Sequence, residues 1–194
     1  MGITQTEEKK DQQHEDNAIL DNHHVENYIM KKPYVIIIGI GPYDKPWTTL
    51  AAIPADIANM KHLWLNTFKY DPSYVTIITK DINSKYVSLK SLNKELNKVQ
   101  GLLNLGQRKD CDGLIIIYTG HDSTNGANNY ILTSDIQQLR ILDIQNKFSS
   151  AGCDFLANKP KILYFDCCRG DNDINPSQIK HRKGDKGISG RFIE

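Results

Sequence analysis

The sequence predicts an α/β protein, a three-layer α/β/α sandwich built on a mostly parallel sheet. Two observations favour this class: short β-branched apolar runs recur along the chain, and segments with apolar residues at helical spacing lie between them. Strands that alternate with helices form parallel sheets with helices on both faces. The chain has 194 residues, 39% of them hydrophobic, which is enough for one domain with a core of ordinary size.

Four apolar runs are expected to form the main strands of the sheet. The first is a continuous β-branched run, which is typical of a strand buried on both faces. A short additional strand is expected after the Asn125-Gly126 turn signal. The main strands are Tyr34–Ile40, Tyr74–Thr79, Gly113–Tyr118 and Lys161–Cys167, and the additional strand is Tyr130–Thr133.

Three segments between these strands have apolar residues at the spacing of amphipathic helices. The expected helices are Ile53–Phe68, Val87–Leu105 and Leu142–Ala151. Pro54 suits the first turn of the first of them. Because crossovers between parallel strands are right-handed, this element order leaves few topologies.

Polar segments flank the alternating elements. Residues 1–32 and 171–194 contain few apolar residues to offset the entropy of ordering them. We therefore expect a disordered or partly helical leader at 1–32, one folded domain at 33–170, and a polar linker or tail at 171–194 without a strand.

Composition argues against several function classes. Lys and Arg number 24 and Asp and Glu 23, so the chain lacks the basic excess of a nucleic-acid-binding protein. No apolar run approaches the ~20 residues of a transmembrane helix. No signal peptide is visible and the cysteines lack CxxC spacing, so we expect thiols in a reducing compartment, the cytoplasm. The G-I-G after the first strand lacks the third glycine of a dinucleotide site.

Two chemically reactive side chains follow two of the predicted strands. Y-T-G-H ends at His121 after the third strand, and D-C-C-R-G carries Cys168 after the fourth. In open α/β sheets, ligands bind beyond the carboxyl ends of the strands. If these strands are neighbours, about 5 Å apart, the imidazole and the thiol can meet. The imidazole would then favour the thiolate and later protonate a leaving amine, which predicts nucleophilic catalysis by His121 and Cys168.

These segments resemble the caspase-like cysteine peptidases. Y-T-G-H is followed by D-C-C-R-G with His121 and Cys168 47 positions apart, a spacing similar to that of the family. The segment L-A-A-I-P-A-D-I-A-N-M, residues 50–60, resembles the opening of the first helix of metacaspases. The resemblance runs from about Pro33 to Gly170. It implies a caspase/hemoglobinase-like fold, large-subunit portion, lacking the C-terminal small-subunit strands.

The resemblance also implies roles for individual residues. Cys168 stands at the nucleophile position and His121 at the base position. The backbone N–H groups of Asp122 and Cys168 would form the oxyanion hole. A backbone carbonyl is expected to orient the imidazole in place of an acidic residue. Cys167 is the alternative nucleophile, although strand alternation points it to the opposite face.

Specificity is predicted from charge. Asp166 stands two residues before the nucleophile, as in metacaspases, and Asp56 matches the acid of the metacaspase pocket. Two carboxylates repel an acidic side chain and attract Lys or Arg, so cleavage after basic residues is expected. The alternative interpretations are a helix-start charge for Asp56 and a hydrogen-bonded strand end for Asp166.

Two departures favour a second function. Asp122 stands where the family has glycine, and its carboxylate would repel a developing oxyanion. The small-subunit strands are also not expected in this chain. The alternative is a catalytically weak or inactive module that binds a small-subunit chain or a full-length relative through its sheet edge. No cofactor and no metal are expected for the peptidase, with Asp171 and Asp173 as a candidate calcium pair; its partners are protein or peptide substrates.

Overall fold

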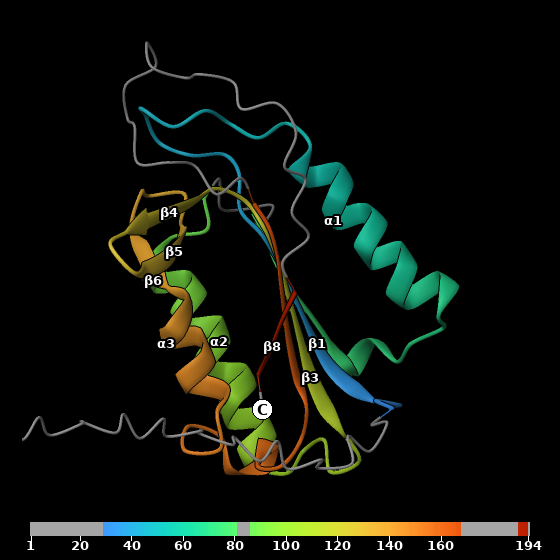
Figure 1. Cartoon of the computed structure of the whole chain (residues 1–194). Coiled ribbons are helices and arrows are strands. Elements are labelled where there is room, and N and C mark those ends of the chain that lie inside the picture. Colours follow the sequence, from blue (N-terminus) through green and yellow to red (C-terminus); the bar gives the residue numbers. More distant parts are fainter. Residues whose placement is uncertain (1–28, 81–85, 168–189, 194) are drawn as a thin grey trace, which may run out of the picture.

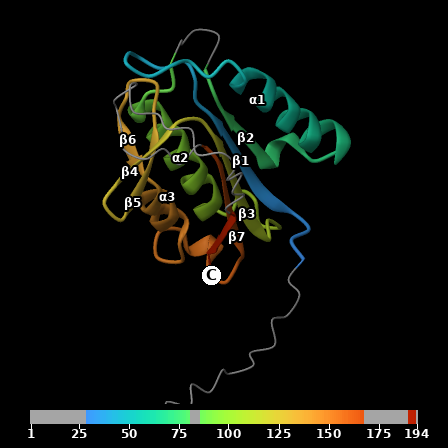
Figure 2. The ribbon, with the colours of Figure 1, turned by 45° about the horizontal axis from the view of Figure 1, so that its top comes forward.

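The computed structural model describes residues 29–80, 86–167 and the backbone of 190–193. In this part of the chain, helices lie on both faces of a five-stranded sheet, which confirms the three-layer α/β/α arrangement. One helix, α1, lies on one side of the sheet, and α2 and α3 lie on the other (Figures 1 and 2). No described helix is both long and apolar enough to cross a bilayer.

The central sheet has the strand order β2-β1-β3-β7-β8. Its parallel pairs are β1 with β2, β1 with β3, and β3 with β7. The third and fourth predicted strands are therefore neighbours, with Thr119 opposite Asp166. The strands are β1 (Pro33–Gly39), β2 (Val75–Ile78), β3 (Gly113–Thr119), β7 (Lys161–Asp166) and β8 (Gly190–Ile193).

The strand β8 corrects an expectation. We expected no strand within 171–194, yet Gly190–Ile193 pairs antiparallel with β7. The physical reason is the open edge of β7, whose backbone N–H and C=O groups need partners, and the four residues G-R-F-I supply them. A run of four residues inside a polar stretch carries too little periodicity to predict such a strand from sequence.

The helices agree with the predicted segments to within a few residues at most ends. The helix expected at 53–68 is α1 (Ile53–His62), continued by the π-helical turn η1 (Leu63–Thr67). The other two are α2 (Leu89–Asn104) and α3 (Ile141–Phe148). The hydroxyl of Ser88 caps α2 by accepting a hydrogen bond from the backbone N–H of Ser91. Short 3-10 turns are η2 (Pro72–Tyr74) and η3 (Asp154–Leu156).

A second, antiparallel sheet stands where a single short strand was expected. It consists of β4 (Asp122–Asn125), β5 (Asn128–Leu132) and β6 (Gln138–Arg140). Gly126, with φ of 58°, makes the turn between β4 and β5. The sheet lies at the end of α2 and α3 nearest the carboxyl ends of the main strands (Figure 1). It begins one residue after His121, so the pairing of β4 determines the direction of the backbone that follows His121.

The apolar core is divided by the main sheet into two unequal parts. Ile36 and Ile38 of β1 belong to the larger cluster, with α2 and α3, and Val35 and Ile37 belong to the smaller cluster under α1. All four side chains are fully buried, as the continuous β-branched run predicts. Tyr164 of β7 is only partly buried at the border of the smaller cluster.

Candidate active site

His121 lies just beyond the carboxyl end of β3. Its imidazole is half-buried beside the rings of Tyr43 and Trp47, with centroid separations of 4.7 and 4.9 Å. Nε2 lies 2.9 Å from the carbonyl oxygen of Thr48. Because a carbonyl can only accept, Nε2 carries the proton, and Nδ1 of the neutral ring is an acceptor. A backbone carbonyl of the kind expected from the sequence is therefore present, and Nδ1 can serve as a base.

The backbone of His121, like its ring, is held by hydrogen bonds. Its N–H donates to the hydroxyl of Tyr43 at 2.7 Å. Its carbonyl accepts from the hydroxyl of Tyr118 and from the backbone N–H of Leu132, the latter at 3.0 Å. Every polar backbone group of His121 thus has a partner.

Cys168 lies outside the described residues, and so does its backbone N–H. The structure describes the strand that leads to it. Thr119 pairs with Asp166 in the β3–β7 ladder, and His121 and Cys168 each follow two residues later. The two strands that carry the predicted dyad are therefore adjacent and in register.

Cys167, the alternative nucleophile, is half-buried and packs against the larger core cluster on the α2–α3 side of the sheet. Asp166 lines a pocket on the α1 side. The side chains of Asp166 and Cys167 therefore lie on opposite faces of the sheet, as alternation along a strand requires.

Asp122 is the first residue of β4, opposite Ile131, and is only 7% exposed. Its carboxyl group lies near the two tyrosine hydroxyls that hold His121. Burial raises the pKa of Tyr43 to about 12, and the nearby carboxylate of Asp122 adds to that rise. Burial likewise raises the pKa of Tyr118 well above its usual value.

The remaining described thiols do not offer a nucleophile. Cys111 and Cys153 are buried, 2% and 0% exposed. Burial raises the pKa of both thiols, which disfavours the reactive thiolate.

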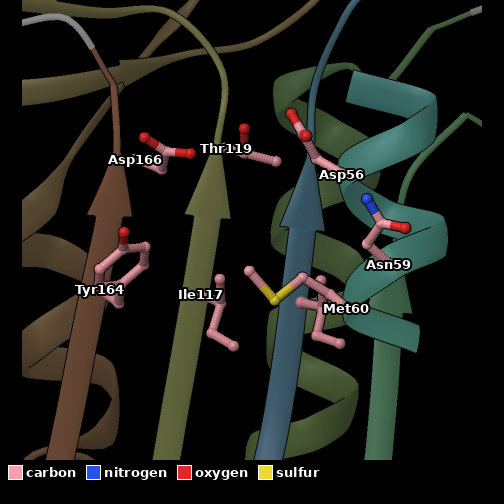
Figure 3. Close-up of a pocket in the computed structure, with 8 residues that line it drawn as sticks. Asp56, Asn59, Met60, Ile117, Thr119, Tyr164 and Asp166 are labelled. Atoms are coloured by element: carbon pink, nitrogen blue, oxygen red, sulfur yellow. The ribbon is translucent and has the colours of Figure 1, made fainter. Parts of the chain in front are cut away.

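A pocket with a cavity volume of about 160 Å³ lies between α1 and the carboxyl ends of β1, β3 and β7. Asp56 of α1 and Asp166 of β7 stand on either side of Thr119, near the carboxyl ends of the strands (Figure 3). The rest of the lining is mostly apolar. The lining residues are Ile37, Asp56, Asn59, Met60, Ile117, Thr119, Tyr164 and Asp166. The arrangement suits a long side chain with an apolar stem and a cationic end.

The structure thus brings together the two acids predicted for the pocket. Asp56 lines this pocket and also lies in the first turn of α1, the position that the helix-start interpretation assumes. Among the described residues, no cluster of three or more His, Cys, Asp or Glu side chains is placed to hold a metal ion. The candidate calcium pair, Asp171 and Asp173, lies outside the described residues.

Sequence reasoning missed several residues of the site. Asn59 follows Asp56 by one helical turn, and Tyr164 precedes Asp166 by two strand positions, so the periodicities could have found both. Tyr43, Trp47 and Thr48 lie in the loop between β1 and α1. No local pattern marks them, because only tertiary folding brings this loop to His121.

The comparisons with known proteins agree with this geometry. The sequence profile of the caspase domain matches residues 32–191. The fold is similar to that of the Drosophila initiator caspase Dronc, with a TM-score of 0.55 and 19% identity over 85% of this chain and 61% of that chain. It is also similar to caspase-1 from Spodoptera frugiperda, with a TM-score of 0.57 and 18% identity over 76% of this chain and 54% of that chain. The chain thus spans about 54–61% of these two structures. No curated protein sequence matches it.

Proposed function

Because this chain belongs to the caspase-domain family of cysteine peptidases, we propose that it is a cysteine endopeptidase with Cys168 as nucleophile and His121 as base. The observation that carries the proposal is the position of His121. It follows β3, the strand paired with the one that leads to Cys168, and its Nδ1 is left as an acceptor by the Nε2 contact with Thr48.

The proposed reaction begins with transfer of the Cys168 thiol proton to Nδ1 of His121. The thiolate then attacks the scissile carbonyl, whose oxyanion is stabilised by the backbone N–H groups of Asp122 and Cys168. The imidazolium returns its proton to the leaving amine, which frees one product and leaves a thioester. Water, deprotonated by the same nitrogen, hydrolyses the thioester and restores the thiol. Thiol and imidazole supply all of this chemistry, so we propose no cofactor.

We propose that the enzyme cleaves after Arg or Lys, as its resemblance to metacaspases implies. The stem of either side chain would lie against Ile37, Ile117 and Met60. Its cationic end would reach the carboxylates of Asp56 and Asp166, which an acidic side chain would not approach. We also propose a cytoplasmic location, where Cys111 and Cys153, which form no disulfide, would stay reduced.

A second candidate function is a module that acts by binding rather than by cleavage. One observation favours it: Asp122 stands where the resemblance implies glycine. In this case the partner would be a small-subunit chain or a full-length relative bound through the sheet edge.

The two functions are separated by assaying the full chain with reporter peptides that end in Arg, Lys or Asp, with and without calcium. A peptidase cleaves after Arg or Lys, and the substitutions Cys168→Ala and His121→Ala abolish cleavage while Cys167→Ser does not. Cleavage after Asp that persists in Cys168→Ala would overturn both the dyad and the pocket assignment.

Thiol labelling tests the binding module directly. Rapid alkylation of wild-type chain by an iodoacetamide probe, lost in Cys168→Ala but kept in Cys167→Ser, is the expected result for a peptidase. Slow labelling at Cys168, together with a partner that co-purifies in stoichiometric amount, would favour the binding module.

A further inference from the structure

Two tyrosine hydroxyls form hydrogen bonds with the backbone of His121, one with its N–H and the other with its carbonyl oxygen. Tyr43 comes from the loop after β1 and accepts the N–H of His121 at 2.7 Å. Tyr118 comes from β3 itself and donates to the carbonyl of His121, with a longer contact of 3.4 Å to the carbonyl of Leu132. The hydroxyls of the two tyrosines also interact with each other. His121, in the short link between β3 and β4, is thereby bound to two separate segments of the domain.

Gly120 shows how closely the two hydroxyls approach the chain. A Cβ at this position would lie 2.4 Å from the hydroxyl oxygen of Tyr118 and 2.7 Å from that of Tyr43. Contacts this short are excluded sterically, so any other residue would push both hydroxyls away. The glycine of the Y-T-G-H motif is therefore needed by the tyrosine pair, not by a left-handed turn.

Burial keeps the pair in a single protonation state. Tyr43 is 7% exposed and Tyr118 is fully buried. Because desolvation raises the pKa of Tyr43 to about 12 and that of Tyr118 well above its usual value, both phenols stay protonated at neutral pH. They can hold His121 but do not exchange protons with a substrate.

We propose that Tyr43 and Tyr118 are positioning residues that act on the proposed peptidase reaction through His121. The two hydroxyls fix the peptide units on either side of its Cα, and the ring of Tyr43 also lies 4.7 Å from the imidazole. Together with the Thr48 carbonyl, which engages Nε2, they restrain both the backbone and the ring of His121 and leave Nδ1 as the nitrogen that the carbonyl does not engage. Catalytic groups must be held within about 0.5 Å of their productive position, which is the purpose of such a support.

The expected effect of the two tyrosines on catalysis rests on the proposed function, whereas their effect on the orientation of His121 is independent of it. The test therefore has two readouts in the variants Tyr43→Phe and Tyr118→Phe. Each removes one hydroxyl and keeps the ring. The matched control is Tyr34→Phe, because Tyr34 is 3% exposed and its hydroxyl bonds Thr76 at 2.8 Å, near the opposite end of the sheet.

The first readout is kinetic. We expect kcat to fall about 10- to 100-fold in Tyr43→Phe and Tyr118→Phe, with KM for an Arg-terminated peptide nearly unchanged, because a small displacement of the base affects chemistry and not binding. Tyr34→Phe is expected to keep both constants. Equal losses in all three variants would overturn the proposal, since they would reflect general destabilisation.

The second readout is the NMR signal of the Nε2 proton of His121, identified by its loss in His121→Ala. In the wild type, the Thr48 contact is expected to protect this proton from exchange with water, and in both tyrosine variants the signal should broaden or shift. A signal unchanged in both overturns the positioning role even if the chain cleaves no peptide. A chain that is inactive yet shows the expected shifts refutes the peptidase proposal and supports the positioning of His121.

Discussion

In the proposed peptidase, the hydrogen bond between Nε2 of His121 and the Thr48 carbonyl would replace the carboxylate that orients the base in many nucleophilic enzymes. A carbonyl fixes the tautomer as a carboxylate would, but adds no formal negative charge. The imidazolium formed during the proposed reaction would then be stabilised less strongly, which suits a thiol nucleophile that needs only modest activation. The proposed chemistry would therefore depend on one neutral acceptor and on the accuracy with which the ring is held.

At the scale of single residues, we expect Asp56→Asn and Asp166→Asn each to lower kcat/KM for Arg-terminated peptides by about 10-fold or more. Each change removes a charged acceptor for the guanidinium and keeps the shape of the pocket. Peptides with a neutral residue at the same position should be affected much less. Asp143→Asn is the control, because that carboxylate pairs with Arg140 on the surface of α3. Equal losses for Arg and neutral peptides would contradict the pocket assignment.

The buried tyrosines predict a loss of stability at alkaline pH. The folded-state pKa of Tyr43 is about 12, and that of Tyr118 is also raised, against an unfolded value of 10.0. Above pH 10 the unfolded chain releases protons that the folded chain retains, so the free energy of unfolding falls by about 1.4 kcal/mol per pH unit for each such tyrosine. Denaturant unfolding measured across this range should show a shallower fall in Tyr118→Phe. An unchanged slope would contradict the desolvation of Tyr118.

At the scale of elements, prediction from sequence succeeded where one local pattern decided the outcome. Burial on both faces requires the β-branched run of β1, and burial of one face requires the helical spacing of apolar residues in α2. Both elements were therefore expected near their observed positions. The small sheet was predicted only in part, because β4 (D-S-T-N) has no apolar alternation and forms only by pairing with β5. Asp56 and Asp166 were found through the family resemblance, and Tyr43 and Thr48 were missed because a loop brings them to the site.

The packing of α1 on β1 gives a prediction about that helix. A Cβ at Gly39 would lie 2.4 Å from side-chain atoms of Ile57, so Gly39→Ala should push α1 outward and displace Asp56. We expect lower stability and a raised KM for Arg-terminated peptides, with kcat less affected.

Gly101→Ala is the matched control within α2. No atom lies within 4 Å of a Cβ at Gly101, so the substitution should stabilise the chain by about 0.5–1 kcal/mol through helix propensity. Thermal unfolding and peptide kinetics of both variants check the pair. Unaltered stability and KM in Gly39→Ala would contradict the prediction that this substitution displaces α1.

At the scale of the whole molecule, the edge beside β7 is the feature that sequence could not foresee. The first three strands are ordered by hydrophobic pattern and right-handed crossovers, but the occupant of this edge depends on which segment reaches it. β8 pairs with Lys161–Tyr164 and stops short of Phe165 and Asp166. The chain spans 61% and 54% of the two caspase structures that it matches.

Removing β8 should change the association state of the chain. A chain ending at Ser189 would present the bare backbone of β7, which favours pairing between two copies. We expect dimers whose fraction rises with concentration in sedimentation velocity, at concentrations where the full chain shows fewer. Identical sedimentation of the two chains would indicate that β8 does not protect this edge.

The loop between β1 and α1 both holds His121 and leads to the helix that lines the pocket. It supplies Tyr43 and Thr48 to the histidine and leads within a few residues to the helix that carries Asp56. In the proposed enzyme, a substitution that re-angles this short stretch alters turnover and side-chain preference at once. Directed evolution of a new cleavage preference should therefore begin from Tyr164 and Asp166, the pocket residues on β7, which do not belong to this loop.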